Sequence, residues 1–110
     1  MVEVKKYDVV LDTFRTTKDV DIFNILSRTP LIVIYKNTAE YGDKYVARLW
    51  EYRKLNKNSP FTQLPQSRYI PTIYIVLADS MAEISKKIPW FLNFLPRYMD
   101  DDPCIVGVYI

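Results

Sequence analysis

The chain has 110 residues, of which 49% are apolar and 25% charged, a length and balance typical of one folded domain with one hydrophobic core. Its formal net charge of +2 is too small to identify a partner. Histidine is absent and glycine occurs only twice, which excludes histidine-based catalysis and Gly-rich phosphate-binding loops. With a single cysteine there is no internal disulfide, and no apolar stretch reaches the length of a membrane helix. We therefore expect a cytoplasmic protein that contacts no membrane.

The first third of the chain predicts a strand followed by a helix. Residues 2–11, "VEVKKYDVVL", are rich in β-branched residues and predict the strand. Residues 16–30, "TTKDVDIFNILSRTP", predict the helix, with Thr17 as its N-cap and Pro30 preventing its continuation. Three apolar residues recur at helical spacing and are expected to form its buried side: Val20, Phe23 and Leu26.

Three more strands and a long loop are predicted in the middle of the chain. The continuous apolar run 31–36 predicts a central strand. Residues 44–52 alternate in character and predict a second strand. The face of this strand expected in the core comprises Tyr45, Ala47 and Leu49. Residues 53–68 have no periodicity, contain four basic residues and predict a flexible basic loop that is functional, disordered or both. A strand is predicted again at 69–78.

The last third predicts a second helix and a final strand. Ser80 and Glu83 form an S-x-x-E capping box, and Pro89 ends the helix. The buried face of this helix is expected to comprise Met81, Ile84 and Ile88. Residues 90–99 predict an irregular or helical turn, and residues 104–110 predict the final strand. Alternation along this strand places four residues on one buried face: Cys104, Val106, Val108 and Ile110.

Three consecutive aspartates, Asp100, Asp101 and Asp102, raise the question of a metal site or a catalytic carboxylate cluster. Adjacent residues point in different directions, so at most two of the three could ligate one ion. No distant carboxylate pattern completes such a site, and the segment predicts an aspartate-rich turn before Pro103. We expect no metal and no cofactor. Cys104, among valines, predicts a buried and unreactive thiol.

The expected fold follows from the order of elements, β-α-β-β-β-α-β. Two helices are too few to cover both faces of a sheet, so both are expected on the same face. The fold class is α+β with two layers, and the sheet is mixed or mostly antiparallel with about five strands. Residues 1–110 are expected to form a single domain, since the chain contains no internal repeat and no low-complexity tract.

Three stretches resemble a family of small, uncharacterised proteins of bacteria and phages: "YVARLW" (45–50), "IVLADSMAEISKKIP" (75–89) and "LPRYMDDDPCIVGVYI" (95–110). That family joins a Y-V-A-R-L-W/F strand to an A-D-(S/T)-x-x-E-I-x-x-x-(I/L)-P helix and a D-D-P-x-I-V-x-V ending. The resemblance covers roughly residues 44–110. It implies one continuous domain with 53–68 inserted between two paired strands, and it carries no activity.

The sequence favours a binding protein over an enzyme. No catalytic motif is present, whereas the chain contains nine tyrosines, five phenylalanines and two tryptophans, residue types enriched in binding surfaces. We expect a non-enzymatic domain that binds another protein, as an inhibitor, an immunity or anti-defence factor, or an adaptor. The predicted partner-binding residues are Arg48, Trp50, Tyr52, Arg53, Lys54, Lys57, Phe61 and Arg68.

The alternative function is nucleic-acid binding. Residues 44–68 contain six basic residues against Glu51 as the one acidic residue, interleaved with aromatics that could stack on bases. The same composition also fits a solvated loop, and no known nucleic-acid motif accompanies it. A homodimer formed through the last strand is a further open alternative.

Overall fold

The computed structural model describes residues 8–16, 18–54, 67–97 and 102–110, with 53–54 and 67–68 described by their backbone alone. Neither helix has the length and apolar character needed to cross a membrane, as far as the described residues go. The elements in chain order are β1 (Val9–Leu11), α1 (Val20–Arg28), β2 (Leu31–Thr38), β3 (Gly42–Lys54), β4 (Ser67–Ala78), α2 (Met81–Ser85), β5 (Phe94–Pro96) and β6 (Ile105–Tyr109).

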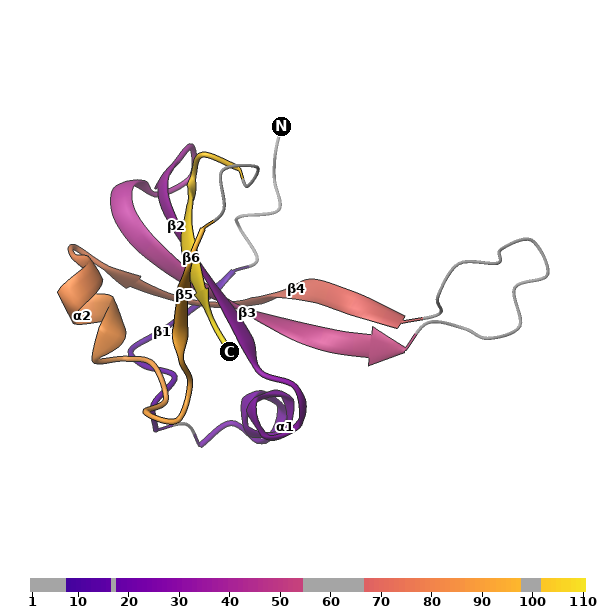
Figure 1. Ribbon diagram of the computed structural model, residues 1–110. Helices are drawn as coiled ribbons and strands as arrows, with labels where there is room; N and C mark the ends of the chain where they lie inside the picture. The colour runs from indigo at the N-terminus through magenta and orange to yellow at the C-terminus, as the bar shows by residue number, and fades with distance from the viewer. Residues whose placement is uncertain (1–7, 17, 55–66, 98–101) are drawn as a thin grey trace, which may run out of the picture.

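The strands form one mixed sheet in the order β1-β4-β3-β2-β6-β5 (Figure 1). β1 runs parallel to β4, and the other neighbouring pairs are antiparallel. This confirms the α+β class. The described residues contain six strands where about five were expected, because β5 lies in the segment 90–99 that predicted a turn. β5 has three residues and ends at Pro96, too short for alternation to signal it.

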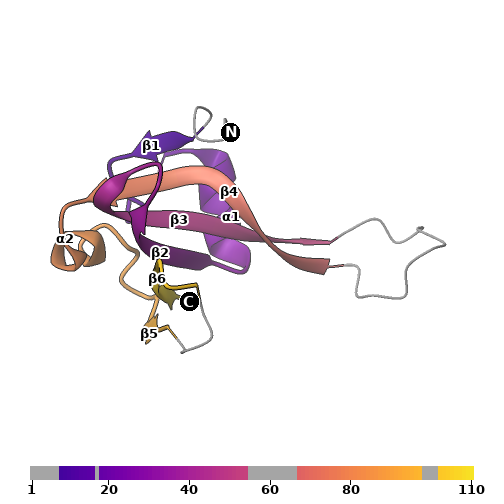
Figure 2. The same ribbon diagram turned by 90° about the horizontal axis from the view of Figure 1, so that it is seen from above.

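Both helices pack on the same face of the sheet, as expected (Figure 2). The core on this face combines residues of α1, α2 and alternate positions of the central strands. Its members include Phe14, Ile22, Leu26, Ile32, Ile34, Ala47, Leu49, Val76, Ala78, Ile84, Ile88, Leu92 and Tyr109. The opposite face carries the intervening strand residues, and no helix of the described chain covers it.

Helix α1 turns a different side to the core from the one predicted. Its N-cap is Asp19, not Thr17, and the Asp19 carboxylate accepts hydrogen bonds from the backbone N–H of Asp21 (2.8 Å) and of Ile22 (3.2 Å). The buried residues are Ile22 and Leu26, with Ile25 partly buried beside them. Because these three have the i, i+3, i+4 spacing of one apolar stripe, they fill the contact with the sheet. Val20 and Phe23, predicted to be buried, are exposed.

Helix α2 confirms the predicted cap. The Ser80 hydroxyl accepts a hydrogen bond from the backbone N–H of Glu83 at 3.2 Å. The Glu83 carboxylate accepts one from the backbone N–H of Asp79 at 3.1 Å, one residue earlier than in the usual box. The helix ends at Ser85 rather than near Pro89, and Ile84 and Ile88 are buried as predicted.

Strands β3 and β4 extend further than predicted and form a two-stranded arm that projects from the body (Figure 1). The loop predicted over 53–68 is therefore wrong at both ends, because Arg53 pairs with Arg68 and Lys54 pairs with Ser67 in the β-ladder. Residues 55–66, including Lys57 and Phe61, lie outside the described residues. We call residues 51–54 and 67–70 the arm.

The final strand, β6, and its flanking residues do not place the four predicted residues, 104, 106, 108 and 110, on one buried face. A register shift between the partners of Ile34 and Tyr35 interrupts the alternation. Val106 packs against the core, whereas Val108 pairs with Val33, which lies on the opposite face. Cys104 is only half-buried and Ile110 is exposed, so the prediction of a buried thiol was wrong.

The turn before β6 is held by Asp102. Its carboxylate accepts a hydrogen bond from the Cys104 N–H at 2.8 Å, and its carbonyl accepts one from the Ile105 N–H at 2.9 Å. This is the short-range bonding expected of an aspartate turn. Asp100 and Asp101 lie outside the described residues.

Candidate functional site

The predicted partner-binding residues fall into two places on β3 and β4. Arg48 and Trp50 line a cavity on the helix-free face, while the others that are described lie on the arm. The arm holds Tyr52, Arg53, Lys54 and Arg68. The predicted partner-binding residues thus do not form one site, because β3 is long enough to extend from the body of the protein into the arm.

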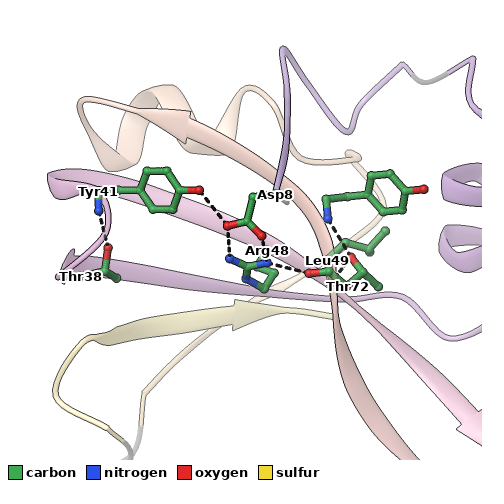
Figure 3. Close-up of polar contacts among 7 residues, drawn as sticks. Asp8, Thr38, Tyr41, Arg48, Leu49 and Thr72 are labelled. Carbon is green, nitrogen blue, oxygen red and sulfur yellow. Dashed lines mark hydrogen bonds and ion pairs between the residues drawn. The ribbon is translucent and has the colours of Figure 1, made fainter. Parts of the chain in front are cut away.

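Arg48 is engaged in a bidentate ion pair rather than presented to solvent (Figure 3). Each of its two Nη atoms donates to one carboxylate oxygen of Asp8 at 2.9 Å, and Nη1 also donates to the Thr72 carbonyl at 2.7 Å. The Arg48 and Asp8 side chains are 15% and 5% exposed. Although burial opposes the charged form, the Asp8 carboxylate raises the pKa of Arg48 above its usual value. The ion pair therefore ties β3 to the residue that precedes β1.

Tyr41 completes this network from the turn between β2 and β3. Its hydroxyl donates to Asp8 Oδ2 at 2.7 Å, and its backbone N–H donates to Thr38 Oγ1 at 3.2 Å (Figure 3). Burial and the hydrogen bond to Asp8 raise the pKa of Tyr41 from 10.0 to about 12. Asp8 thus accepts hydrogen bonds from both Arg48 and Tyr41. The three residues cover part of the sheet face on which no described helix packs.

A cavity of about 520 Å³ lies beside this network, walled by Tyr35, Tyr41 and Trp50 among others. Among the described residues, no acceptor lies within hydrogen-bond geometry of the buried Nε1–H of Trp50. Burial raises the pKa of Tyr35, and the nearby Trp50 N–H acts in the opposite direction. Asp8 and Arg48 neutralise each other on its wall, and Glu40 is the third charged residue among the described lining residues.

The arm carries aromatic and basic residues at its base. Tyr52 and Tyr69 are cross-strand partners, and their rings meet edge to face with centroids 5.2 Å apart. The ladder also places Arg53 opposite Arg68.

Two basic residues that contributed to the nucleic-acid alternative are paired within the protein. Lys44 forms an ion pair with Asp79, and Arg48 forms the pair with Asp8. Two of the six basic residues of 44–68 are therefore neutralised by aspartates.

A cleft of about 540 Å³ separates the base of the arm from helix α1. Its charged lining residues are Asp21, Arg28 and Glu51, so both signs of charge occur. The cleft has no consistent electrostatic preference, and we assign no ligand to it.

The described aromatic residues with the highest solvent exposure lie elsewhere, on α1 and in the segment after α2. Trp90 is 79% exposed, Val20 70%, Phe23 59% and Phe91 52%. The rings of Trp90 and Phe91 meet edge to face with centroids 5.8 Å apart. Val20 and Phe23 are three residues apart on α1 and so lie on one side of the helix. We call these four residues the aromatic surface.

The aromatic surface borders a cavity of about 520 Å³. Phe23 and Phe91 stand at its rim, and the buried residues Phe14, Leu26 and Pro89 also line it. The remaining described lining residues are Arg15, Thr16 and Ser27. Scattered exposed apolar residues are normal, but aromatic residues grouped around a hollow mark an interaction site.

The sequence analysis left this surface out, because it assigned Phe23 to the core and did not count Trp90 and Phe91 among the predicted partner-binding residues. One signal was available. The stripe Ile22, Ile25 and Leu26 fills a helix face by itself and leaves Val20 and Phe23 without a place in the core.

No three cysteine, aspartate or glutamate side chains come together as metal ligands in the ranges that the structure describes. The described carboxylates of Asp8 and Asp79 form ion pairs with Arg48 and Lys44. Comparison with known proteins adds no family and no relative: no family model, curated protein or solved structure matches this chain.

Proposed function

We propose that this chain is a non-enzymatic protein-binding domain whose partner docks on the aromatic surface. One observation carries the proposal: the exposed residues Phe23 and Phe91 line the same cavity with an apolar floor, and Trp90, which is 79% exposed, touches Phe91. A domain of this size gains most of its stability by burying such side chains. Leaving them in water is explained if a partner covers them.

The size of the gain supports the proposal. An aromatic side chain buries about 150–250 Å² in a protein interior, and apolar burial contributes about 25 cal/mol per Å². Covering Trp90 together with Phe91 is therefore worth several kcal/mol before the costs of association. Tryptophan is also one of the residue types enriched among the few interface residues that contribute most of the binding free energy.

An inhibitor, an immunity or anti-defence factor and an adaptor all need the same thing from this domain, a rigid surface of fixed shape. Both sides of the aromatic surface are anchored. Helix α1 packs on the sheet through Ile22 and Leu26, and the segment after α2 packs through Ile88 and Leu92. The surface is thus held in place without the partner, which reduces the entropy lost on binding.

Nucleic-acid binding by the arm is the second candidate. Three basic residues of the sequence, Arg53, Lys54 and Arg68, belong to the strands of the arm and favour it, because cations bind phosphates. The pairing of Lys44 and Arg48 with aspartates leaves this candidate fewer cations than the sequence suggests. We therefore rank it below protein binding.

Affinity capture from source cells tests the proposal with two matched baits. One bait carries Trp90→Ser with Phe91→Ser, and the other carries Tyr52→Ser with Tyr69→Ser. Both pairs are exposed aromatics in edge-to-face contact, so the chemical change is similar and only the location differs.

We expect the partner to be lost with the Trp90/Phe91 bait and kept with the Tyr52/Tyr69 bait. The reverse result contradicts our choice of surface. A salt titration of the captured complex then separates the two candidates, because phosphate contacts weaken steeply as salt rises and apolar contacts do not.

A further inference from the structure

We infer that the partner inserts an apolar side chain into the cavity beside the aromatic surface and places a carboxylate against Arg15. This rests on the proposed function and names the chemistry of the partner segment. Two features of the structure carry it: the hollow shape of the site and the charge at its rim.

The site is concave and its floor is apolar. Phe14 and Leu26 form buried parts of the wall, and Phe23 and Phe91 stand around the opening. A hollow of about 520 Å³ with such walls accepts a protruding side chain of the size of leucine, methionine or phenylalanine. An anchor of this kind would lie against Phe23 and Phe91 and leave Trp90 to cover its flank.

The charge at the rim is positive. Among the described residues that line the cavity, Arg15 alone is charged, and no described carboxylate forms an ion pair with it. The segments 12–18 and 86–91 on the two sides of the site carry four basic residues against one acidic residue. The carboxylate of Asp19, next in the chain, is turned into the cap of α1.

Arg15 is also held in place by its own backbone. Its N–H donates to Thr13 Oγ1 at 3.0 Å, and the preceding N–H, of Phe14, donates to the Lys87 carbonyl at 2.9 Å. The Thr13 hydroxyl donates to that same carbonyl at 3.2 Å. The chain on both sides of the cavity is thus joined, and the backbone from which the Arg15 side chain extends is fixed. A guanidinium suits recognition of a carboxylate.

An anionic lipid surface offers a related chemistry, because aromatic and basic residues together also bind membranes. The shape favours a peptide. A bilayer is contacted by side chains that protrude into it, whereas this site has a hollow that lipid would leave unfilled. We therefore commit to a peptide segment and treat lipid as an outcome of the test.

The experiment selects random dodecapeptides displayed on phage against the immobilised full chain. We expect enrichment of sequences that place Leu, Met, Phe or Trp next to Asp or Glu. Affinity is then measured with a synthetic selected peptide through the fluorescence of Trp90, in a Trp50→Phe background that leaves Trp90 as the only tryptophan. Phe91→Ser should abolish binding.

A charge reversal tests the role of Arg15. Arg15→Glu should weaken the acidic peptide by about two- to fivefold, the range for one solvent-accessible ion pair. A peptide with Lys in place of its acidic residue should recover that loss on Arg15→Glu and bind the unaltered chain more weakly. Arg15 is exposed, so the variant should fold.

The inference is overturned by selection that enriches no peptides, by enrichment without acidic residues, or by equal binding to Arg15→Glu. It is also overturned if the chain co-sediments with phosphatidylcholine/phosphatidylglycerol vesicles and Trp90→Ser abolishes this. A cellular partner that depends on Trp90 and Phe91 but ignores Arg15→Glu leaves the proposed function standing and removes only this inference.

Discussion

Two tryptophans of this protein lie in opposite surroundings. Trp50, on β3, lies beside the Arg48–Asp8 ion pair with its Nε1 atom buried. Trp90, after α2, is 79% exposed and touches Phe91 edge to face. Trp50 closes a face of the sheet that no helix covers, whereas Trp90 adds little to the fold as it stands.

The difference shows how the protein divides its aromatic and charged residues. On the helix-free face, Asp8, Arg48 and Tyr41 satisfy one another's hydrogen bonds, and aromatic side chains such as Trp50 cover the sheet in place of a helix. On the aromatic surface, aromatic side chains of similar size are exposed to solvent. We therefore expect changes near Trp50 to act on folding, and changes near Trp90 to act on binding.

The largest expected effect comes from breaking the ion pair. Arg48→Met removes the bidentate cation that pairs with the Asp8 carboxylate, which is 5% exposed, and should lower the free energy of unfolding by about 3–5 kcal/mol. Urea denaturation followed by circular dichroism measures this loss. The control is Arg48→Met with Asp8→Ala, which removes both charges and should recover part of it. A loss below about 1 kcal/mol would show a pair that behaves as a surface ion pair.

The two tryptophans provide the direct comparison. Trp50→Ala should cost near the lower end of the about 3–5 kcal/mol seen for buried Trp→Ala changes, because the side chain is only partly buried. Trp90→Ala should change the free energy of unfolding by no more than about 0.5 kcal/mol, as for surface positions. The same denaturation experiment measures both. Equal costs would mean that Trp90 packs against the fold and that our binding surface has no basis.

Much of the fold could be predicted from local patterns. The α+β class, the helix cap at Ser80 and the strands around Ile32 and Ala47 follow from spacing and residue type. These patterns are local, because each depends on neighbours within a few residues. β5 was missed since three residues that end at Pro96 leave no period to detect.

The candidate site could not be predicted in the same way. Periodicity shows which residues share a side of α1, but it does not show which side the sheet covers. Val20/Phe23 and Ile22/Leu26 are both apolar pairs. Ile25 extends the second pair into a stripe, and packing on the sheet buries that stripe. Likewise, the partner of Arg48 is Asp8, forty residues earlier in the chain, and no local pattern connects them.

The connection between the two strands of the arm can be shortened without changing either tryptophan. Lys54 and Ser67 are partners in the ladder, so a two-residue Asn-Gly turn can replace residues 55–66 and close the hairpin. We expect the free energy of unfolding to stay level or rise by up to about 1.5 kcal/mol, because a shorter loop costs less entropy to close. The captured partner should be retained. Its loss, in a variant with unchanged stability, would transfer the binding site to the arm.

The smallest effect concerns Tyr41 and the pH range above 10. Its pKa rises from 10.0 to about 12 in the folded protein, through burial first and then Asp8. Between these values the unfolded chain loses the phenolic proton while the folded chain keeps it, so the free energy of unfolding falls as pH rises. One proton limits this slope to about 1.4 kcal/mol per pH unit.

Tyr41→Phe isolates this contribution, because burial also raises the pKa of Tyr35, Tyr74 and Tyr109 and these remain in both proteins. At neutral pH the variant lacks the hydrogen bond to Asp8 and should be less stable by about 1 kcal/mol. Since only the unaltered protein then loses the Tyr41 contribution as pH rises from about 10 to 12, the difference between the two should shrink across that range. Urea denaturation at several alkaline pH values measures it. A difference that stays constant up to pH 12 would show that Asp8 and burial do not hold the Tyr41 proton.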